Sequence, residues 1–112
     1  MPLPFKIDYL LTSGRVESER LEFKTGWNPL SVMHTLCAFA NDFHNLGGGY
    51  IVIGVAEQNG QPVLPPVGLK LSELDGIQQE LVRLGHLIRP DYHPLVSPCE
   101  YQGRHILVLR AH

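Results

Sequence analysis

The chain has 112 residues, of which 44% are apolar and 18% are charged. A chain of this length forms one domain, and its apolar content supports a hydrophobic core, which excludes an intrinsically disordered protein. Nine Lys and Arg residues against eleven Asp and Glu residues give a net charge of -2. The chain therefore lacks the basic excess that by itself indicates nucleic-acid binding, and any such contact needs a local patch of cations.

No window of the sequence approaches the apolar run of a signal peptide or a membrane span of about 20 residues. The two cysteines, Cys37 and Cys99, have no metal-site spacing, so we expect buried, reduced thiols. These features predict a cytoplasmic protein without membrane contact. Because the sequence stops directly after an apolar strand, we expect residues 1–112 to be a single domain at the N-terminus of a longer protein.

The first two predicted elements are a short helix and a charged strand. Residues 5–13 have apolar side chains at mixed spacing, which predicts a short helix over one edge of the core. From Arg20 to Lys24 charged and apolar residues alternate, as in a half-buried strand that points Leu21 and Phe23 to the core. The opposite face carries three charged residues: Arg20, Glu22 and Lys24.

A helix and a buried strand follow. Asn28-Pro29 predicts a helix start, because Asn accepts a hydrogen bond from the first turn and Pro needs no N–H there. Apolar residues then recur at three- and four-residue steps, which predicts a helix over residues 29–43 that packs on a sheet. After the glycines at 47–49, an apolar run predicts a central strand over residues 50–55, covered on both faces.

The next segment predicts a hairpin and a second helix. Asn59-Gly60 is typical of a tight turn, and the prolines around it confine a return strand over residues 62–64 to an edge of the sheet. Ser72 with Asp75 resembles a capping box, and the apolar spacing that follows predicts an amphipathic helix to about Leu87.

Residues 95–101 and 105–109 flank Gln102-Gly103 and predict a closing hairpin. We expect its two strands to join those over residues 20–24 and 50–55 in one sheet. The predicted fold class is therefore α+β: a single domain with a mixed β-sheet and two main amphipathic helices packed on it.

The charged strand allows two interpretations. Glu17 lies five positions before Glu22, so their carboxylates converge only if the chain turns near Ser18. Converging carboxylates would hold a divalent cation that activates water for phosphodiester attack. In the alternative, both glutamates pair with Arg20 and Lys24 on a solvated strand face and need no metal.

Three motifs follow one another: Glu-Ser-x-x-Leu-Glu-Phe-Lys at residues 17–24, Ala-Phe-Ala-Asn at 38–41 and Gly-Gly-Tyr-Ile-Val-Ile-Gly-Val at 48–55. Together they resemble the Schlafen AlbA-type domain of bacterial transcriptional regulators and of Schlafen proteins. The resemblance implies an α+β domain with a mixed sheet. It also implies DNA binding in the bacterial members and a metal-dependent endoribonuclease in the Schlafen members.

By motif position, the two glutamates of the Schlafen acidic site correspond to Glu17 and Glu22. The aspartate that completes this site directly follows the Ile-Gly-Val strand, where the chain has Ala56, with Glu57 one position later. The resemblance therefore implies that the third metal ligand is missing or displaced.

Our leading prediction is a DNA-binding module of a bacterial transcriptional regulator, with no catalytic activity and no cofactor. We favour DNA over RNA as its partner. Lys and Arg at strand spacing match a phosphate track, and we expect the contact surface to include four residues: Arg20, Lys24, Asn41 and Gly48.

Two alternatives remain open. The first is a metal-dependent endoribonuclease that uses Mg²⁺ or Mn²⁺ and carries its acidic residues at Glu17, Glu22 and Glu57. The second is a protein-interaction or dimerisation module, in which the edge strand after Asn59-Gly60 pairs with a second copy to give a homodimer.

Overall fold

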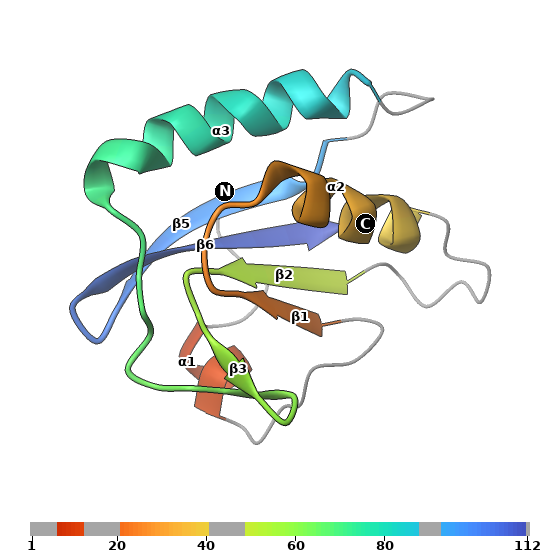
Figure 1. The fold of residues 1–112 in the computed structure, drawn as a ribbon. Coiled ribbons are helices and arrows are strands. Elements are labelled where there is room, and N and C mark those ends of the chain that lie inside the picture. The colour runs from red at the N-terminus through yellow and green to blue at the C-terminus, as the bar shows by residue number, and fades with distance from the viewer. Residues whose placement is uncertain (1–6, 13–20, 41–48, 88–92, 112) are drawn as a thin grey trace.

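The computed structural model describes residues 7–12, 21–40, 49–87 and 93–111 (Figure 1). Its helices are α1 (Ile7–Thr12), α2 (Pro29–Ala40) and α3 (Leu71–Gly85). The main sheet has the spatial order β1 (Leu21–Lys24), β2 (Gly49–Ile53), β6 (Arg104–Ala111) and β5 (Leu95–Tyr101). A separate ribbon pairs β3 (Glu57–Gln58) with β4 (Gln61–Pro62).

The main sheet is mixed, as predicted, and contains all four predicted strands. β1 pairs in parallel with β2, because helix α2 crosses over between them and returns the chain to the same end of the sheet. β6 runs antiparallel to both of its neighbours, β2 and β5. The fold is therefore α+β, with the strand-helix-strand unit β1-α2-β2 at one side of the sheet.

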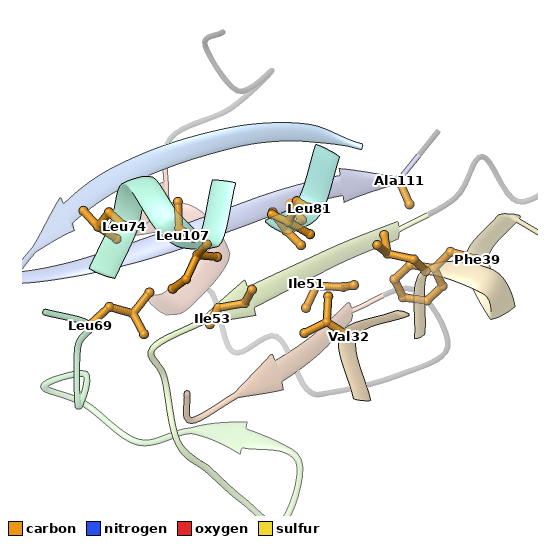
Figure 2. Close-up of a cluster of buried hydrophobic side chains, with 12 residues drawn as sticks. Val32, Phe39, Ile51, Ile53, Leu69, Leu74, Leu81, Leu107 and Ala111 are labelled. Atoms are coloured by element: carbon orange, nitrogen blue, oxygen red, sulfur yellow. The ribbon is translucent and has the colours of Figure 1, made fainter. Parts of the chain in front are cut away.

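The two faces of the sheet form two apolar clusters. Helices α2 and α3 cover one face (Figures 1 and 2), where Ile51 and Ile53 of β2 meet apolar side chains of both helices. Helix α1 covers part of the other face, where Val52 packs with Leu10 and Leu11. Because the buried side chains of β2 point alternately into the two clusters, β2 is the buried central strand that the apolar run predicts.

Helix α2 begins at the predicted residue. The side-chain carbonyl of Asn28 accepts a hydrogen bond from the Ser31 N–H at 3.2 Å, and its main-chain carbonyl accepts one from the Val32 N–H at 3.0 Å. These contacts satisfy amide groups that have no partner inside the first turn. The described part of the helix ends at Ala40, and the predicted continuation to Phe43 lies outside the described residues.

Helix α3 begins earlier than predicted. Lys70 is its N-cap, and the Glu73 carboxylate accepts a hydrogen bond from the Lys70 N–H at 2.9 Å. The predicted capping role of Ser72 is therefore wrong, because Glu73 closes the first turn at Lys70, two residues earlier along the chain. With 15 residues α3 is the longest described helix, and no described helix is long and apolar enough to cross a membrane.

The predicted turn is present, but the return strand lies elsewhere than expected. Asn59 and Gly60 have φ of 54° and 79°, the left-handed backbone of a tight hairpin turn. The strands that they join, β3 and β4, pair only with each other, so the prediction of an edge strand in the main sheet is wrong. Gly54 has φ of 105°, and its left-handed backbone ends β2 and turns the chain away from the sheet.

Both cysteines are free thiols, as predicted, but both are half-buried. Cys99 lies on β5, an edge strand of the main sheet. Its Sγ atom is 3.6 Å from the main-chain carbonyl oxygen of Ser97. The prediction of buried thiols is therefore wrong; for Cys99 the reason is that an edge strand has a neighbour on one side only.

Candidate functional site

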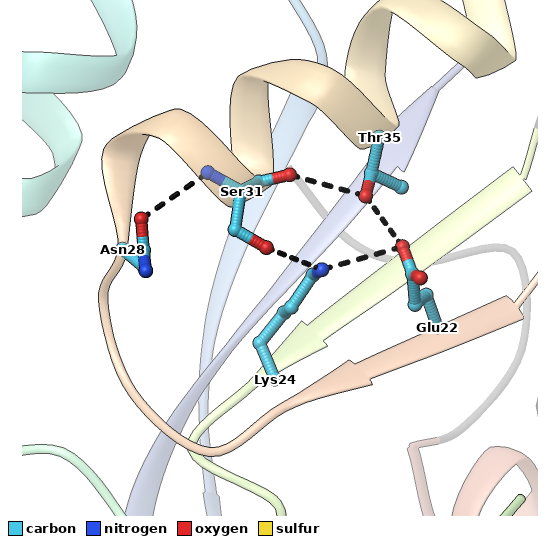
Figure 3. Close-up of polar contacts among 5 residues, drawn as sticks. All are labelled: Glu22, Lys24, Asn28, Ser31 and Thr35. Atoms are coloured by element: carbon cyan, nitrogen blue, oxygen red, sulfur yellow. Dashed lines mark hydrogen bonds and ion pairs between the residues drawn. The ribbon is translucent and has the colours of Figure 1, made fainter.

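The charged strand β1 alternates as its sequence predicts. Leu21 and Phe23 are buried among the residues of the α1 face, and Glu22 and Lys24 point to the opposite face, under α2 (Figure 3). Only 33% of the Glu22 side chain and 18% of the Lys24 side chain are exposed. The expectation of a solvated charged face is therefore wrong, because α2 covers a large part of both side chains.

Glu22 and Lys24 form an ion pair that two hydroxyl groups of α2 complete. The Lys24 Nζ atom lies 3.6 Å from Glu22 Oε2 and donates a hydrogen bond to Ser31 Oγ at 2.7 Å (Figure 3). The hydroxyl of Thr35, a buried residue, donates to the same Glu22 oxygen. The predicted pairing of Glu22 with Lys24 is thus confirmed, and the pair is fixed by hydrogen bonds to α2.

Glu57 has a different role from the one expected for a metal ligand. It is exposed on β3, after the chain has left the main sheet at Gly54, and its carboxylate accepts a hydrogen bond from the Gly60 N–H at 3.0 Å. Ala56 is half-buried, and its carbonyl accepts a hydrogen bond from Val63 at 2.8 Å. Both residues therefore serve the β3-β4 ribbon.

The described residues do not supply a set of metal ligands. Among them no group of three or more His, Cys, Asp and Glu side chains is placed to hold a metal ion. Glu22 directs one carboxylate oxygen to Lys24 and Thr35, and Glu57 directs one to its own turn. These residues alone therefore do not fit a Mg²⁺ or Mn²⁺ site, since such ions prefer several oxygen ligands.

The predicted site residues divide into three groups. Glu22 and Lys24 lie together in the described structure, whereas Glu57 belongs to the ribbon. The other four predicted residues lie outside the described residues: Glu17, Arg20, Asn41 and Gly48.

Sequence reasoning missed Ser31 and Thr35, which complete the network. The two residues are one helical turn apart, and that spacing places both on the same helix face. The sequence carried a signal for this contact. Ser31 and Thr35 are four positions apart in a predicted helix, and they follow Glu22 and Lys24, which are two positions apart in a predicted strand.

The outer face of α3 carries more carboxylates than cations. Glu73 and Asp75 are exposed on its first turns. Further along, Arg83 donates a hydrogen bond to Glu80 at 2.7 Å, which lowers the pKa of the Glu80 carboxyl below its ordinary value. Carboxylates thus outnumber cations on this helix, and a polyanion is repelled from its outer face.

The comparisons with known proteins agree with this fold. The solution NMR structure of the N-terminal domain of a RecG-related protein from Nitrosomonas europaea is similar with a TM-score of 0.68 and 26% identity, over 91% of this chain and 67% of that chain. A crystal structure of a Corynebacterium diphtheriae protein is similar with a TM-score of 0.54 and 21% identity, over 94% of this chain. The chain spans 24% of that second protein.

No curated protein sequence matches the chain. The family model described as Schlafen, AlbA_2 matches residues 17–112. This match includes β1, α2 and β2, the elements that carry the three motifs, and continues through the closing hairpin of β5 and β6. The chain therefore belongs to the Schlafen, AlbA_2 family.

Proposed function

We propose that the chain is a nucleic-acid-binding domain, with DNA favoured over RNA, and that it serves a bacterial transcriptional regulator. The observation that carries the proposal is the similarity, over 91% of the chain, to a domain of a RecG-related protein whose name refers to an ATP-dependent DNA helicase. Membership of the Schlafen, AlbA_2 family also supports nucleic-acid binding.

Lys24 is a described cation with a donor available for a phosphate contact. An ammonium group has three N–H donors. Ser31 accepts one, and Glu22 lies within ion-pair distance of the group. One donor is left for a phosphate oxygen. Because these contacts already hold the Lys24 side chain, phosphate binding costs little further side-chain entropy.

The rest of the proposed contact surface continues from Lys24. Arg20 lies outside the described residues, and it is included because the alternating sequence from Arg20 to Lys24 predicts that it shares a face with Glu22 and Lys24. Asn41 and Gly48 also lie outside the described residues and fall between α2 and β2 in the sequence. The acidic outer face of α3 favours an approach of the polyanion from the β1 side of the sheet.

Pairing between two copies through the hairpin after Asn59-Gly60 has less support. The strand β4 has two residues, and one of them is Pro62, which has no N–H to donate to a partner strand. Its other residue, Gln61, already pairs with Gln58 of β3. The ribbon is therefore a poor template for a second copy, and nucleic-acid binding is the function that we favour.

The first prediction concerns the dependence of DNA binding on salt. Replacing Arg20 and Lys24 with Ala should weaken binding to every duplex sequence alike, because phosphate contacts do not read bases. The slope of log affinity against log salt should fall by about one unit for each phosphate group that the variant no longer neutralises. A titration of labelled duplex DNA at a series of salt concentrations measures both quantities.

Arg83→Ala is the matched control, because this variant removes an exposed cation of α3 that is already paired with Glu80. It should bind as the wild type does. Unchanged affinity in the Arg20→Ala, Lys24→Ala double variant would remove this surface from the binding site.

The second prediction is that the chain does not cleave a folded RNA appreciably with Mg²⁺ or Mn²⁺. Metal-assisted phosphoryl transfer needs enough oxygen ligands to hold the ion and still leave positions for water and phosphate. Ala56 has no side-chain ligand, and the Glu57 carboxylate is bonded to its own turn. Gel analysis of the RNA after incubation with each metal measures cleavage.

Two variants give this measurement its controls. Ala56→Asp places a carboxylate at the position that follows the Ile-Gly-Val strand. Glu22→Ala removes one carboxylate of the Glu17 and Glu22 pair, the one that lies within the described residues. Robust cleavage by the wild type that depends on metal and disappears in Glu22→Ala would contradict the prediction and favour the endoribonuclease.

A further inference from the structure

The spacing of two hydroxyl groups on α2 matches the spacing of two charges on β1. Residues four apart in a helix are separated by about 6 Å along its axis, and residues two apart in a strand are separated by about 6.6 Å. Ser31 and Thr35 therefore lie opposite Lys24 and Glu22 respectively, and each hydroxyl contacts one member of the ion pair (Figure 3). The helix and the strand form one polar site.

Two hydrogen-bond donors of this site are unused among the described residues. Lys24 has three N–H donors. Its contacts with Ser31 and Glu22 use two of them, so one is left. The Ser31 oxygen accepts from Lys24, and within the described part of the chain its own O–H has no acceptor. The donors belong to atoms 2.7 Å apart. They are therefore close enough to bind oxygens of one phosphate group together, and both side chains are partly exposed.

The rest of the network fixes these donors in place. Thr35 is 7% exposed, and its hydroxyl donates to the Glu22 oxygen that faces Lys24. A lysine side chain that is free in solvent samples many conformations, and ordering it opposes binding. Here Glu22 and Ser31 hold the ammonium group from two sides before any ligand arrives, which reduces this cost.

We infer that Ser31 and Lys24 together bind one phosphate group of a nucleic-acid backbone, and that Thr35 is a positioning residue that holds Glu22 and thereby Lys24. This inference rests on the proposed function and names the chemical group that the site takes. Ser31 supplies a neutral donor and Lys24 a charged one, so the two residues differ in how their removal changes the dependence of binding on salt.

The experiment compares two variants of the same shape, Ser31→Thr and Ser31→Val, which differ by one hydroxyl group. Binding of the full chain to labelled duplex DNA is measured at a series of salt concentrations. Ser31→Thr should bind close to the wild type, and Ser31→Val should bind about tenfold more weakly, as expected for one hydrogen bond to a charged group. Its salt slope should stay unchanged, whereas Lys24→Ala should reduce the slope by about one unit.

Three further variants separate a phosphate contact from a loss of structure. Ser72→Ala removes an exposed serine from the first turn of α3 and should leave binding unchanged. Thr35→Val should weaken binding about threefold, and Thr35→Ser, which keeps the hydroxyl, should restore it. The double variant Ser31→Val, Lys24→Ala should lose less than the two single losses combined, because both residues contact one phosphate.

The possible failures are distinguishable. Equal binding by Ser31→Thr and Ser31→Val, with weaker binding by Lys24→Ala, overturns the shared phosphate contact and leaves the proposed function standing. Absence of DNA binding by the wild type at every salt concentration, or equal binding by the wild type and the Arg20→Ala, Lys24→Ala variant, overturns this inference together with the proposed surface.

Discussion

Ile51→Ala is expected to lower the free energy of unfolding by about 3–4 kcal/mol, within the range for a fully buried aliphatic side chain replaced by Ala. Ile51 has 0% exposure and lies at the centre of the cluster between the sheet and helices α2 and α3 (Figure 2). Its neighbours there include Val32 of α2 and Leu109 of β6, so the cavity left by the substitution borders several elements. Urea unfolding followed by circular dichroism measures the loss.

The same chain offers a matched control in Leu30→Ala. Leu30 lies in the first turn of α2 with 78% of its surface exposed, so its replacement should change the free energy of unfolding by less than about 0.5 kcal/mol. A loss below about 1 kcal/mol for Ile51→Ala would show that β2 is not the buried centre of the fold.

Local patterns were sufficient to predict the main sheet. The alternation from Leu21 to Lys24 predicts which face of β1 is buried, and the apolar run of β2 predicts a strand covered on both faces. Both patterns are local in the sequence, since successive side chains of a strand alternate between the two faces of the sheet. The hydrophobic effect then assigns the apolar face to the core.

The start of α3 and the position of the β3-β4 ribbon were harder to predict from the sequence. Ser72 is a strong capping residue in isolation, but Glu73 reaches the Lys70 N–H and starts the helix earlier. The turn at Asn59-Gly60 was predictable from its residue types, whereas its separation from the main sheet follows from the left-handed backbone at Gly54. Such choices between competing local contacts depend on how the whole chain packs.

Half of the described polar site was predictable from the sequence. Glu22 and Lys24 lie two positions apart in a strand, so their pairing needs no knowledge of the tertiary fold. Their contacts with Ser31 and Thr35 depend on where α2 lies over β1, which the strand sequence does not encode. The burial of the charges under α2 was missed for the same reason.

Gly54 connects the stability of the fold with the geometry of the polar site. Its N–H donates to the Lys24 carbonyl at 2.7 Å, and its own carbonyl accepts from the Gly68 N–H at 2.8 Å. Its φ of 105° lies in a region that residues with a side chain rarely adopt. A Cβ atom there would lie 3.2 Å from Ile106 Cγ2 and 3.3 Å from Leu69 Cγ.

Gly54→Ala is therefore expected to lower the free energy of unfolding by about 2–4 kcal/mol, from backbone strain and overpacking together. The backbone cannot relax by rotating, because rotation breaks the hydrogen bonds to Lys24 and Gly68. Any partial relaxation moves the Lys24 backbone, so DNA affinity under folding conditions should fall as well. Urea unfolding and the DNA titration measure the two effects on the same sample.

Gly76→Ala is the matched control, and its expected effect has the opposite sign. Gly76 is exposed within α3, and a Cβ atom there meets nothing within 4 Å. Ala in a helix interior should therefore raise the free energy of unfolding by about 0.5–1 kcal/mol, because Gly loses more backbone freedom on folding. If Gly54→Ala proved as harmless as Gly76→Ala, the left-handed turn at the end of β2 would not be required by the fold. The position of Lys24 beside Ser31 would then depend on the hydrogen bonds of the polar site alone.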